Sequence, residues 1–445
     1  MNNNDFMKTK PVLPLILSMS MPMVISMLVN SLYNIVDSYF VAKISENAMT
    51  SLSLVFPVQN FINSIAVGFG VGINAVISYF LGAKKKEQAD NAASIGMLFS
   101  ILHGILIIFI CNLIMPSFLG MFTSDKEVIE LGLKYSRIVF SFSIFICVSL
   151  TFEKVFQAVG KMTFTMISLM SGCIVNIILD PVLIFGLGPV KSLGINGAAI
   201  ATVIGQLTTF LIYVFIYLRK DAGIKFKLRN ISFDISIIKK LYAVGIPATL
   251  NMALPSVLTS ALNAILSSFS GMYVVILGIY YKLQTFLYLP ANGLIQGMRP
   301  IIGYNYGAGE KTRVKQIYHT TLALNSIIMI FGTIICLIIP GQLMGLFSTS
   351  PKTIHAGKTA LRIICLGFII STISVTASGA LEGLGMGLKS LVISLLRYVI
   401  IIIPSAFILS SFAGVYGVWN SFWIAEVITA SFSYIMVRRT FKRMP

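Results

Sequence analysis

A duplication organises the whole chain. Six pairs of glycines recur at a single spacing of 225 residues, as from Gly82 to Gly307. The other pairs are Gly68 and Gly293, Gly72 and Gly297, Gly120 and Gly345, Gly132 and Gly357, and Gly160 and Gly385. The same spacing joins Pro22 to Pro247, Gln59 to Gln284 and Arg137 to Arg362. Self-similarity at one fixed period means that a structural unit occurs twice. We therefore expect two halves that share one fold.

The composition places both halves in a membrane. Of the 445 residues, 56% are hydrophobic and only 11% are charged. About 20 apolar residues cross the hydrocarbon core of a bilayer, and the sequence offers roughly twelve such stretches. We expect these spans at 14–41, 51–81, 92–116, 131–157, 162–187, 195–218, 238–266, 272–303, 317–340, 355–381, 387–411 and 414–437. The predicted fold is an all-α membrane protein with two six-helix lobes, related by a pseudo-two-fold axis along the membrane normal.

Basic residues set the orientation. They gather in alternate loops, at Lys84–Lys86, in the stretch 219–240 and at Arg438–Arg443, whereas the loops between them carry little charge. The positive-inside rule then predicts a multi-pass protein of the plasma membrane with both termini in the cytoplasm. The domains expected are an N-terminal lobe (1–218), a cytoplasmic linker (219–240) and a C-terminal lobe (241–445). The net charge of +18 belongs to these loops and forms no nucleic-acid-binding face.

Other function classes lack their residues. The five cysteines are scattered through predicted helices without CxxC spacing, so we expect neither a resident metal nor a disulfide framework. A membrane enzyme needs a cluster of histidines or acids, and His103, His319 and His355 are isolated. Internal duplication in a membrane chain is typical of a transporter. We therefore predict a transporter that is not an enzyme and has no cofactor other than a coupling ion.

Acidic residues at membrane depth are candidates for function. An ionisable group there costs several kcal/mol unless it faces a cavity or a partner. The acids inside predicted spans are Asp37, Glu153, Asp180, Glu382 and Glu426. Glu153 precedes Lys154 near a helix end, which indicates an interface-level ion pair with a snorkelling lysine. Glu382, at the repeat position of Gln157, is interpreted as structural, and the role of Glu426 is open.

Asp37 and Asp180 indicate one polar site. Both lie late in helices that run outward, and Thr202 lies about two turns into a helix that returns from that side, so the three share a depth. Asn176 is one turn before Asp180 on the same helix face. Pro181 removes the helical donor of a nearby carbonyl. Such a pocket could hold a proton shared between the acids or a Na⁺ ion. The alternative is that each Asp only hydrogen-bonds a neighbouring helix.

Four further polar residues are candidates for lining the cavity or gating it. Lys282 falls near the middle of the predicted span 272–303 with Gln284 beside it, and both a functional and a structural role stay open. Gln59 is the repeat counterpart of Gln284. Arg299 lies nearer the cytoplasm, where we expect it to organise a loop. The glycines of the repeated segments GINAVISYFLGAKKKEQA and GMRPIIGYNYGAGEKTRV allow close helix approach and a hinge, or else simply end helices.

These features resemble the multidrug and toxic compound extrusion (MATE) family. The resemblance is carried by the duplicated loops LGAKKKEQA and YGAGEKTRV and by LYNIVDSYFV, LDPVLIFG and GINGAAIAT. It implies two six-helix lobes around a central cavity, and export of organic cations in exchange for H⁺ or Na⁺. Asp37, Asn176, Asp180 and Thr202 match the cation-site pattern of the DinF-like branch. The family's other large branch carries an acid eight residues beyond a GxP motif, where this chain has Pro255 after Gly245-Ile246-Pro247, so the resemblance implies coupling in the N-terminal lobe.

The predicted function is secondary active multidrug efflux by alternating access, with amphiphilic cations as substrates and antibiotic resistance as its consequence. We expect the chain to work as a monomer in the bilayer and to bind no nucleic acid. The 31 Phe, 21 Met and 17 Tyr residues could line an adaptable apolar cavity. The alternative is a flippase or carrier of the same superfamily. A flippase for lipid-linked oligosaccharides would need a cationic cavity, for which Lys282, Arg299 and Arg397 are available. A major-facilitator carrier would need a different loop after the second span.

Overall fold

The computed structural model describes residues 5–227 and 231–444. The first repeat forms α1 (Phe6–Thr9), α2 (Val12–Ala42), α3 (Glu46–Gly82), α4 (Lys86–Phe122), α5 (Lys126–Ser141), α6 (Ser143–Ala158), α7 (Met162–Phe185) and α8 (Ile195–Arg219). The second forms α9 (Ile235–Ser267), α10 (Gly271–Gly307), α11 (Lys311–Ile338), α12 (Pro340–Gly345), α13 (Pro351–Ile364), η1 (Cys365–Gly367), α14 (Phe368–Gly383), α15 (Gly387–Leu395), η2 (Leu396–Ile400), α16 (Ile402–Ala413) and α17 (Val415–Lys442). No strand occurs among these residues, which confirms the predicted all-α class.

The long helices coincide with the predicted spans. Within the described residues, ten helices are long and apolar enough to cross a membrane, or eleven when α5 and α6, bent by 45° at Phe142, count as one. The twelfth predicted span is α17, which falls outside this set because Asn420, Glu426 and other polar residues interrupt its apolar run. A break recurs at the repeat position of Phe142, where η1 separates α13 from α14. The two halves therefore share this irregularity.

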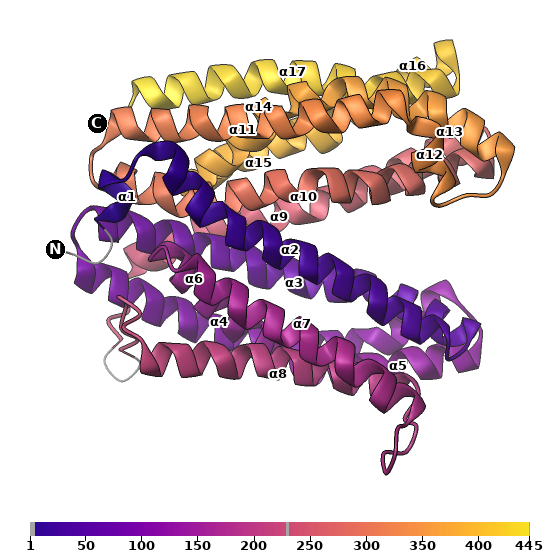
Figure 1. Ribbon diagram of the computed structural model, residues 1–445, viewed down its shortest axis with the longest axis horizontal. Helices are drawn as coiled ribbons and strands as arrows, with labels where there is room; N and C mark the ends of the chain where they lie inside the picture. The colour runs from indigo at the N-terminus through magenta and orange to yellow at the C-terminus, as the bar shows by residue number, and fades with distance from the viewer. Residues whose placement is uncertain (1–4, 228–230, 445) are drawn as a thin grey trace.

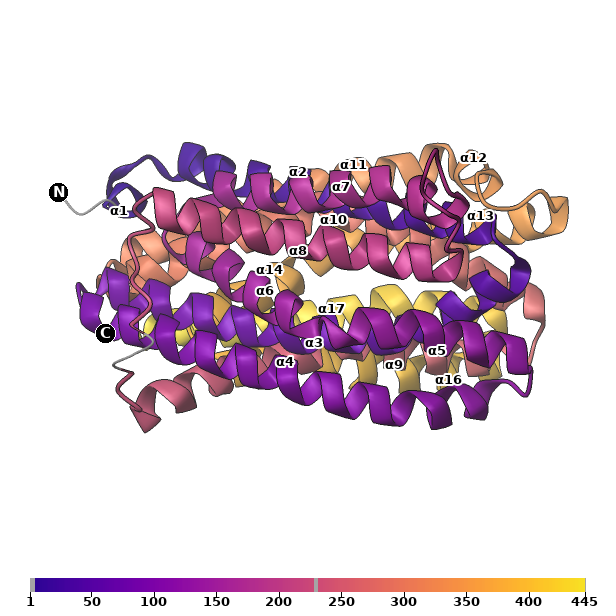
Figure 2. The same cartoon turned by 90° about the horizontal axis from the view of Figure 1, so that it is seen from below.

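The repeats form two lobes. Figure 1 shows most of α3–α8 in the lower half of the molecule and α11–α17 in the upper half, with helix axes along the longest dimension. We call α2–α8 the N-lobe and α9–α17 the C-lobe. Both termini lie at one end of the molecule, the termini end, and the loop between α7 and α8 lies at the opposite end (Figure 1). Seen from below, α7 lies beside α8, and α4 beside α5 (Figure 2).

Repeated glycines hold the lobes together. A Cβ on Gly68 of α3 would meet Thr249 of α9, and one on Gly293 of α10 would meet Val24 of α2. One turn further on, Gly72 and Gly297 face Leu241 and Ser20 in the same way. Nearest the termini end, Gly82 faces the Tyr304 carbonyl and Gly307 faces the Tyr79 carbonyl. We call these six glycines the glycine seam. The predicted close helix approach is confirmed, and it occurs between the lobes.

The turns after α3 and α10 place different residues at their left-handed position. Gly309 adopts φ +76°, and at the corresponding position Lys84 adopts φ +59°, the one positive φ of a non-glycine residue in the described part of the chain. The N–H groups of both residues close the same turn, on the carbonyls of Leu81 and Tyr306 at 3.1 Å. A side chain in this left-handed region costs about 1–2 kcal/mol.

We expect Lys84→Gly to raise the free energy of unfolding by about 1 kcal/mol, because glycine adopts this conformation without strain. Denaturant unfolding of the purified protein in detergent measures the change. Lys85→Gly removes the same charge at φ −98° and serves as the control, which we expect to be neutral or destabilising. Equal stability of Lys84→Gly and the parent would contradict the expectation.

The linker is attached to the N-lobe. The expected linker 219–240 is shorter, because α9 already begins at Ile235. The N–H groups of Lys225 and Lys227 donate to Asp90 Oδ1 at 2.9 Å and Ser94 Oγ at 2.8 Å. Further along, Asn91 and Ser232 exchange two hydrogen bonds, of 2.8 and 3.2 Å. Two successive turns of α4 thus bind the segment that leads to the C-lobe.

Candidate functional site

Two glycines bring α7 and α8 into close contact. A Cβ on Gly205 of α8 would lie 2.8 Å from the Gly172 carbonyl oxygen and 3.0 Å from Asn176 Cβ. Gly197, near the start of α8, packs on the backbone of Leu183. Small residues permit such an approach of two apolar helices. The face of α7 that carries Asn176 therefore lies directly against α8, and α2 also packs on α7.

The predicted polar residues meet between these three helices. Asp37 and Asp180 each lie five residues before the end of their helices, and Thr202 lies seven residues after the start of α8, all towards the opposite end. The shared depth is confirmed. Asp37 is 8% exposed and Asp180 is fully buried, and the two carboxyls are near enough to repel each other. Asn176 and Thr202 are buried as well. We call Asp37, Asn176, Asp180 and Thr202 the acidic site.

Two tyrosines complete the acidic site. Tyr33 and Tyr135 lie within interaction range of Asp37, Asp180 and Thr202. Sequence reasoning did not find either of them. Tyr33 is one turn before Asp37 on the same face of α2, and this spacing was an available signal. Tyr135 comes from α5, and nothing in its sequence neighbourhood indicates the contact.

Six polar atoms of the acidic site make no hydrogen bond to a described residue. Asp37 Oδ1, both carboxyl oxygens of Asp180, both side-chain polar atoms of Asn176 and Thr202 Oγ1 are buried without a hydrogen bond from a described residue. Buried polar groups in native proteins are nearly always hydrogen-bonded, so a cluster of exceptions needs an explanation. An ionised carboxylate only accepts hydrogen bonds. A proton, a cation or water is what these oxygens can take.

The other buried acids have partners. Lys154 Nζ lies 2.7 Å from Glu153 Oε1, Arg299 Nη2 lies 2.6 Å from Glu382 Oε2, and Arg397 Nη2 lies 2.6 Å from Glu426 Oε1. Asp90 accepts the linker hydrogen bond described above. The expected Glu153–Lys154 pair exists, but both side chains are buried inside the N-lobe, so the lysine does not snorkel to an interface. Among described buried acids, Asp37 and Asp180 stand apart as unpaired.

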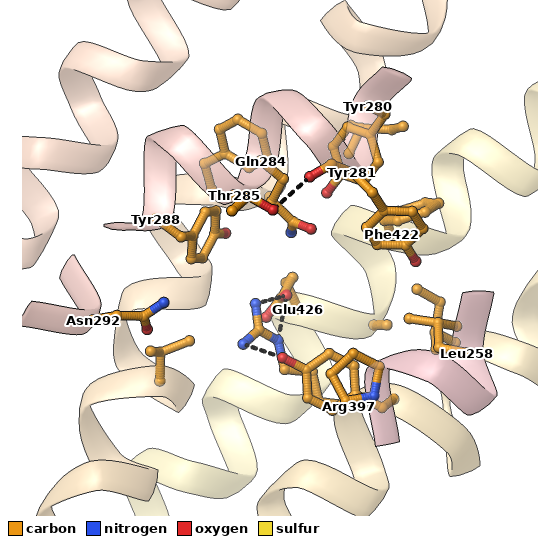
Figure 3. A pocket seen from close by; sticks show the side chains of 18 of the residues that line it. Leu258, Tyr280, Tyr281, Gln284, Thr285, Tyr288, Asn292, Arg397, Phe422 and Glu426 are labelled. Carbon is orange, nitrogen blue, oxygen red and sulfur yellow. Dashed lines mark hydrogen bonds and ion pairs between the residues drawn. The ribbon is translucent and has the colours of Figure 1, made fainter. Parts of the chain in front are cut away.

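A cavity of about 350 Å³ lies in the C-lobe against α2. Its wall carries aromatic side chains from α10, α14, η2 and α17 and a few polar groups: Tyr280, Tyr281, Tyr288, Phe368, Tyr398, Phe422, Gln284, Asn292, Arg397 and Glu426. Figure 3 shows the Arg397 guanidinium beside Glu426, with Tyr288 and Asn292 on the facing wall. Met27 and Ser31 of the N-lobe close one side. The predicted aromatic cavity is present, and both lobes line it.

The four cavity or gating candidates fall in four different places. Gln284 lines the cavity. Lys282 does not, because its side chain is exposed and its ammonium lies 5.7 Å from the ring centre of Phe347. Arg299 is held by Glu382 away from the cavity wall. Gln59 lies near Tyr135 beside the acidic site. The position of a residue along its helix can be read from the sequence, but the direction in which the helix turns its side chain cannot.

Comparisons with known proteins agree with the duplicated fold. The family model described as MatE matches residues 22–182 and again 247–408, one match in each lobe. The multidrug export protein MepA of Staphylococcus haemolyticus (strain JCSC1435) is 27% identical over 419 residues, which cover 94% of this chain and 91% of that protein. MepA of Staphylococcus aureus (strain MRSA252) is 26% identical over 433 residues, covering 97% and 95%.

Solved structures have the same fold. One is the outward-facing conformation of a multidrug resistance MATE family transporter of the MOP superfamily. It superimposes with a TM-score of 0.93 at 24% identity, covering 100% of this chain and 99% of that one. A MOP superfamily transporter from Pyrococcus furiosus, whose structure is titled for the reverse polarity of its binding pocket, also gives a TM-score of 0.93 at 24% identity, covering 99% and 98%.

Proposed function

Because this chain belongs to the MatE family, and is therefore a multi-pass membrane transporter of the multidrug efflux class rather than an enzyme, we propose that it exports amphiphilic organic cations in antiport with H⁺ or Na⁺. The observation that carries the proposal is the acidic site, with its two unpaired carboxyls and its unsatisfied oxygens. A proton or a Na⁺ ion satisfies these oxygens and removes the repulsion between the carboxyls. The coupling ion thus binds in the N-lobe, as in the DinF-like pattern.

The arrangement of the lobes supports alternating access. The glycine seam closes the lobes on each other towards the termini end, which the basic loops assign to the cytoplasm. The acidic site lies near the opposite end and so receives its ion from outside. The cavity between the C-lobe and α2 supplies aromatic faces for an amphiphilic cation. Opening of the seam then exposes the same space to the cytoplasm.

The stoichiometry decides which gradient drives export. Moving one charge across 100 mV is worth about 2.3 kcal/mol, and one pH unit about 1.36 kcal/mol. One H⁺ exchanged for one monovalent cation is electroneutral, so only the pH gradient contributes, at about tenfold accumulation per pH unit. Two carboxyls titrate as a coupled pair and can carry a second ion, which adds the membrane potential.

The flippase alternative receives less support. A cavity for the phosphates of a lipid-linked substrate needs unpaired cations. Lys282 and Arg299 lie off the cavity wall, and Arg397 is neutralised by Glu426. The cavity wall has no net positive charge among its described residues.

Proteoliposomes test the proposal directly. We expect a fluorescent organic cation to move against its gradient when a pH gradient or a Na⁺ gradient is imposed separately, and to stop when the effective gradient is collapsed. Vesicles with Asp37→Asn protein are the control for leakage. Undiminished export after both gradients are dissipated would overturn coupling through the acidic site.

The topology has its own test. Thr312, at the start of α11, and Lys352, at the start of α13, are both exposed and lie at opposite ends of the molecule. In intact cells, we expect a membrane-impermeant maleimide to label Lys352→Cys and to leave Thr312→Cys unlabelled, because the latter faces the cytoplasm. The native cysteines are buried and give the background. Labelling of Thr312→Cys from outside would reverse the orientation.

A further inference from the structure

Arg397 and Glu426 occupy, in the C-lobe, the helix crossing that α7 and α8 form in the N-lobe. Arg397 stands at the repeat position of Gly172, 225 residues later. Glu426 stands at that of Gln206 with a spacing of 220, the same spacing that joins Gly194 to Gly414. Those two glycines precede α8 and α17 with φ of +55° and +56°. The correspondence is therefore one of backbone conformation as well as sequence.

The ion pair is tightly held. Arg397 donates from Nε to Glu426 Oε1 at 2.7 Å, and Nη2 lies 2.6 Å from the same oxygen. Ser374 Oγ of α14 donates to the second oxygen, Oε2, at 3.3 Å, and Nη1 of Arg397 reaches the Tyr398 hydroxyl at 3.4 Å. The arginine is 8% exposed. Both carboxyl oxygens of Glu426 thus have protein donors, unlike those of Asp180.

The backbone is adapted to the arginine. In the N-lobe, a Cβ at the corresponding Gly172 would already meet Thr209 of α8. An arginine therefore does not fit a regular crossing of this kind. In the C-lobe the chain forms the π-helical segment η2 at this position, where α7 is a continuous α-helix. A π-helical turn carries one more residue and marks functional positions in many helices. The widened turn makes room for the guanidinium beside α17.

We propose that the guanidinium of Arg397 acts as a tethered cation, which permanently neutralises the buried Glu426 one helical turn from the C-lobe counterparts of Asn176 and Thr202, and so restricts exchangeable ions to the N-lobe. The inference rests on the proposed function and explains what limits the number of coupling ions. Leu262 stands where the N-lobe has Asp37, so the C-lobe carries no second acid there. Arg397 and Glu426 are the charged residues among those that line the cavity in the described chain. The other titratable groups that face Glu426 are hydroxyls, of Tyr280 and Tyr288 on α10 and Tyr398 on η2.

Removal of the arginine exposes the latent site. A buried ion pair that loses one partner leaves an uncompensated charge, which is strongly unfavourable. Glu426 then has to take up a proton or a cation from the cavity. Arg397→Met is therefore a gain-of-function variant that binds one ion more than the parent. Arg397→Lys keeps a tethered cation, and Arg397→Met combined with Glu426→Gln removes the carboxylate as well, so neither gains the ion.

The chain carries its own reporter for this site. Its two tryptophans, Trp419 and Trp423, both lie in α17, and Trp423 is one turn before Glu426. We would introduce the variants into protein that also carries Asp37→Asn and Asp180→Asn, so that any response comes from the C-lobe. Purified protein is titrated with Na⁺ at constant ionic strength, and separately with acid between pH 9 and pH 5. Tryptophan fluorescence and the melting temperature are recorded without any gradient.

The expected pattern is a response in Arg397→Met alone. Its fluorescence and melting temperature change with Na⁺ or acid, with one additional ion bound per protein, whereas the parent, Arg397→Lys and the double variant do not respond. If Arg397→Met is unstable at high pH, Na⁺ or acid should raise its melting temperature to that of the double variant. A folded Arg397→Met without a response, or one that neither Na⁺ nor acid restores, would overturn the proposal. So would a response of the parent that Glu426→Gln abolishes, because the native pair would then exchange its cation.

A transport measurement separates this inference from the proposed function. With the acidic site intact, Arg397→Met should import one more positive charge per cycle, so the accumulation ratio gains a factor of about ten per 60 mV of membrane potential. Failure of the proposed function would appear as export that persists in Asp37→Asn. The titrations above detect the tethered cation whether or not transport is coupled.

Discussion

Asp37→Asn and Asp180→Asn are each expected to reduce ion-coupled export to the level of vesicles without protein. An amide cannot be protonated and is a poorer ligand for a cation than a carboxylate, so the acidic site loses its ion. Folding should not suffer. Each aspartate lacks a described ionic partner, and replacement by an isosteric amide relieves the cost of a buried charge. We therefore expect equal or higher thermal stability together with loss of transport, measured in the same preparations.

A buried acid with a partner provides the matched control. Glu153→Gln lies in the same lobe and makes the same chemical change, but it leaves Lys154 without its counterion. The expected result is a loss of stability of about 3–5 kcal/mol, because one partner of a buried pair is removed. Loss of stability in one case and loss of transport in the other distinguishes a structural acid from a coupling acid. Wild-type export by either aspartate variant, at equal expression, would remove that residue from the mechanism.

Closure of the glycine seam is the second large effect. In Gly82→Ala and Gly307→Ala the new methyl group coincides with a backbone carbonyl of the other lobe, which cannot rotate away as a side chain does. The lobes have to separate at the termini end. We expect at least a tenfold loss of export, and reaction of a cysteine placed at the buried Ser78 with an impermeant maleimide in inside-out vesicles.

The same repeat supplies the control. Gly120 and Gly345 recur at the same spacing, and nothing lies within 4 Å of a Cβ at either position. Gly120→Ala and Gly345→Ala should leave export unchanged and should slightly favour their helices. Full activity of Gly82→Ala, with Ser78→Cys still protected, would show that the seam does not have to close tightly.

The sequence predicted those features that depend on periodicity. In the described chain a long helical segment lies at each of the twelve predicted spans, because a membrane span needs a fixed length, although α17 is less apolar than the others. Depth along each helix followed, and with it the level shared by Asp37, Asp180 and Thr202. The direction in which each side chain points did not follow from the sequence, because packing between helices sets the rotation of each helix about its axis. Lys282 shows this: its depth is compatible with the cavity, but its side chain faces Phe347 at the surface.

Contacts between distant segments were the other limit. Glu426 follows Arg397 by 29 residues on another helix, and no spacing rule joins them. The local widening at η2 is invisible in a pattern of apolar residues. The acid missing from α9, at Pro255, argued against a Na⁺ site in the C-lobe. The C-lobe does bury a carboxylate, but on α17 and already neutralised.

Comparison of the repeats explains part of this divergence. Lys154 packs over Gly70, where a Cβ would lie 2.7 Å from the lysine Cγ. At the equivalent positions of the C-lobe the sizes are exchanged, with Ile295 packing over Gly379. The space between the two equivalent helices is filled by the Lys154 side chain of α6 in the N-lobe and by the Ile295 side chain of α10 in the C-lobe. Lys154 is therefore a buried charge whose repeat counterpart is Gly379, and the spacing of repeated glycines cannot reveal this difference.

The bound linker has a consequence for the energetics of each cycle. Since Ser232 is held by α4 and α9 begins at Ile235, only Phe233 and Asp234 join the part of the chain that moves with the N-lobe to the C-lobe. So short a tether keeps the partner surfaces at a high effective concentration, which is in the millimolar range for short flexible connections. The surfaces then need little intrinsic affinity to meet again. Contacts this weak can be broken in every turnover without dissociation of the two halves.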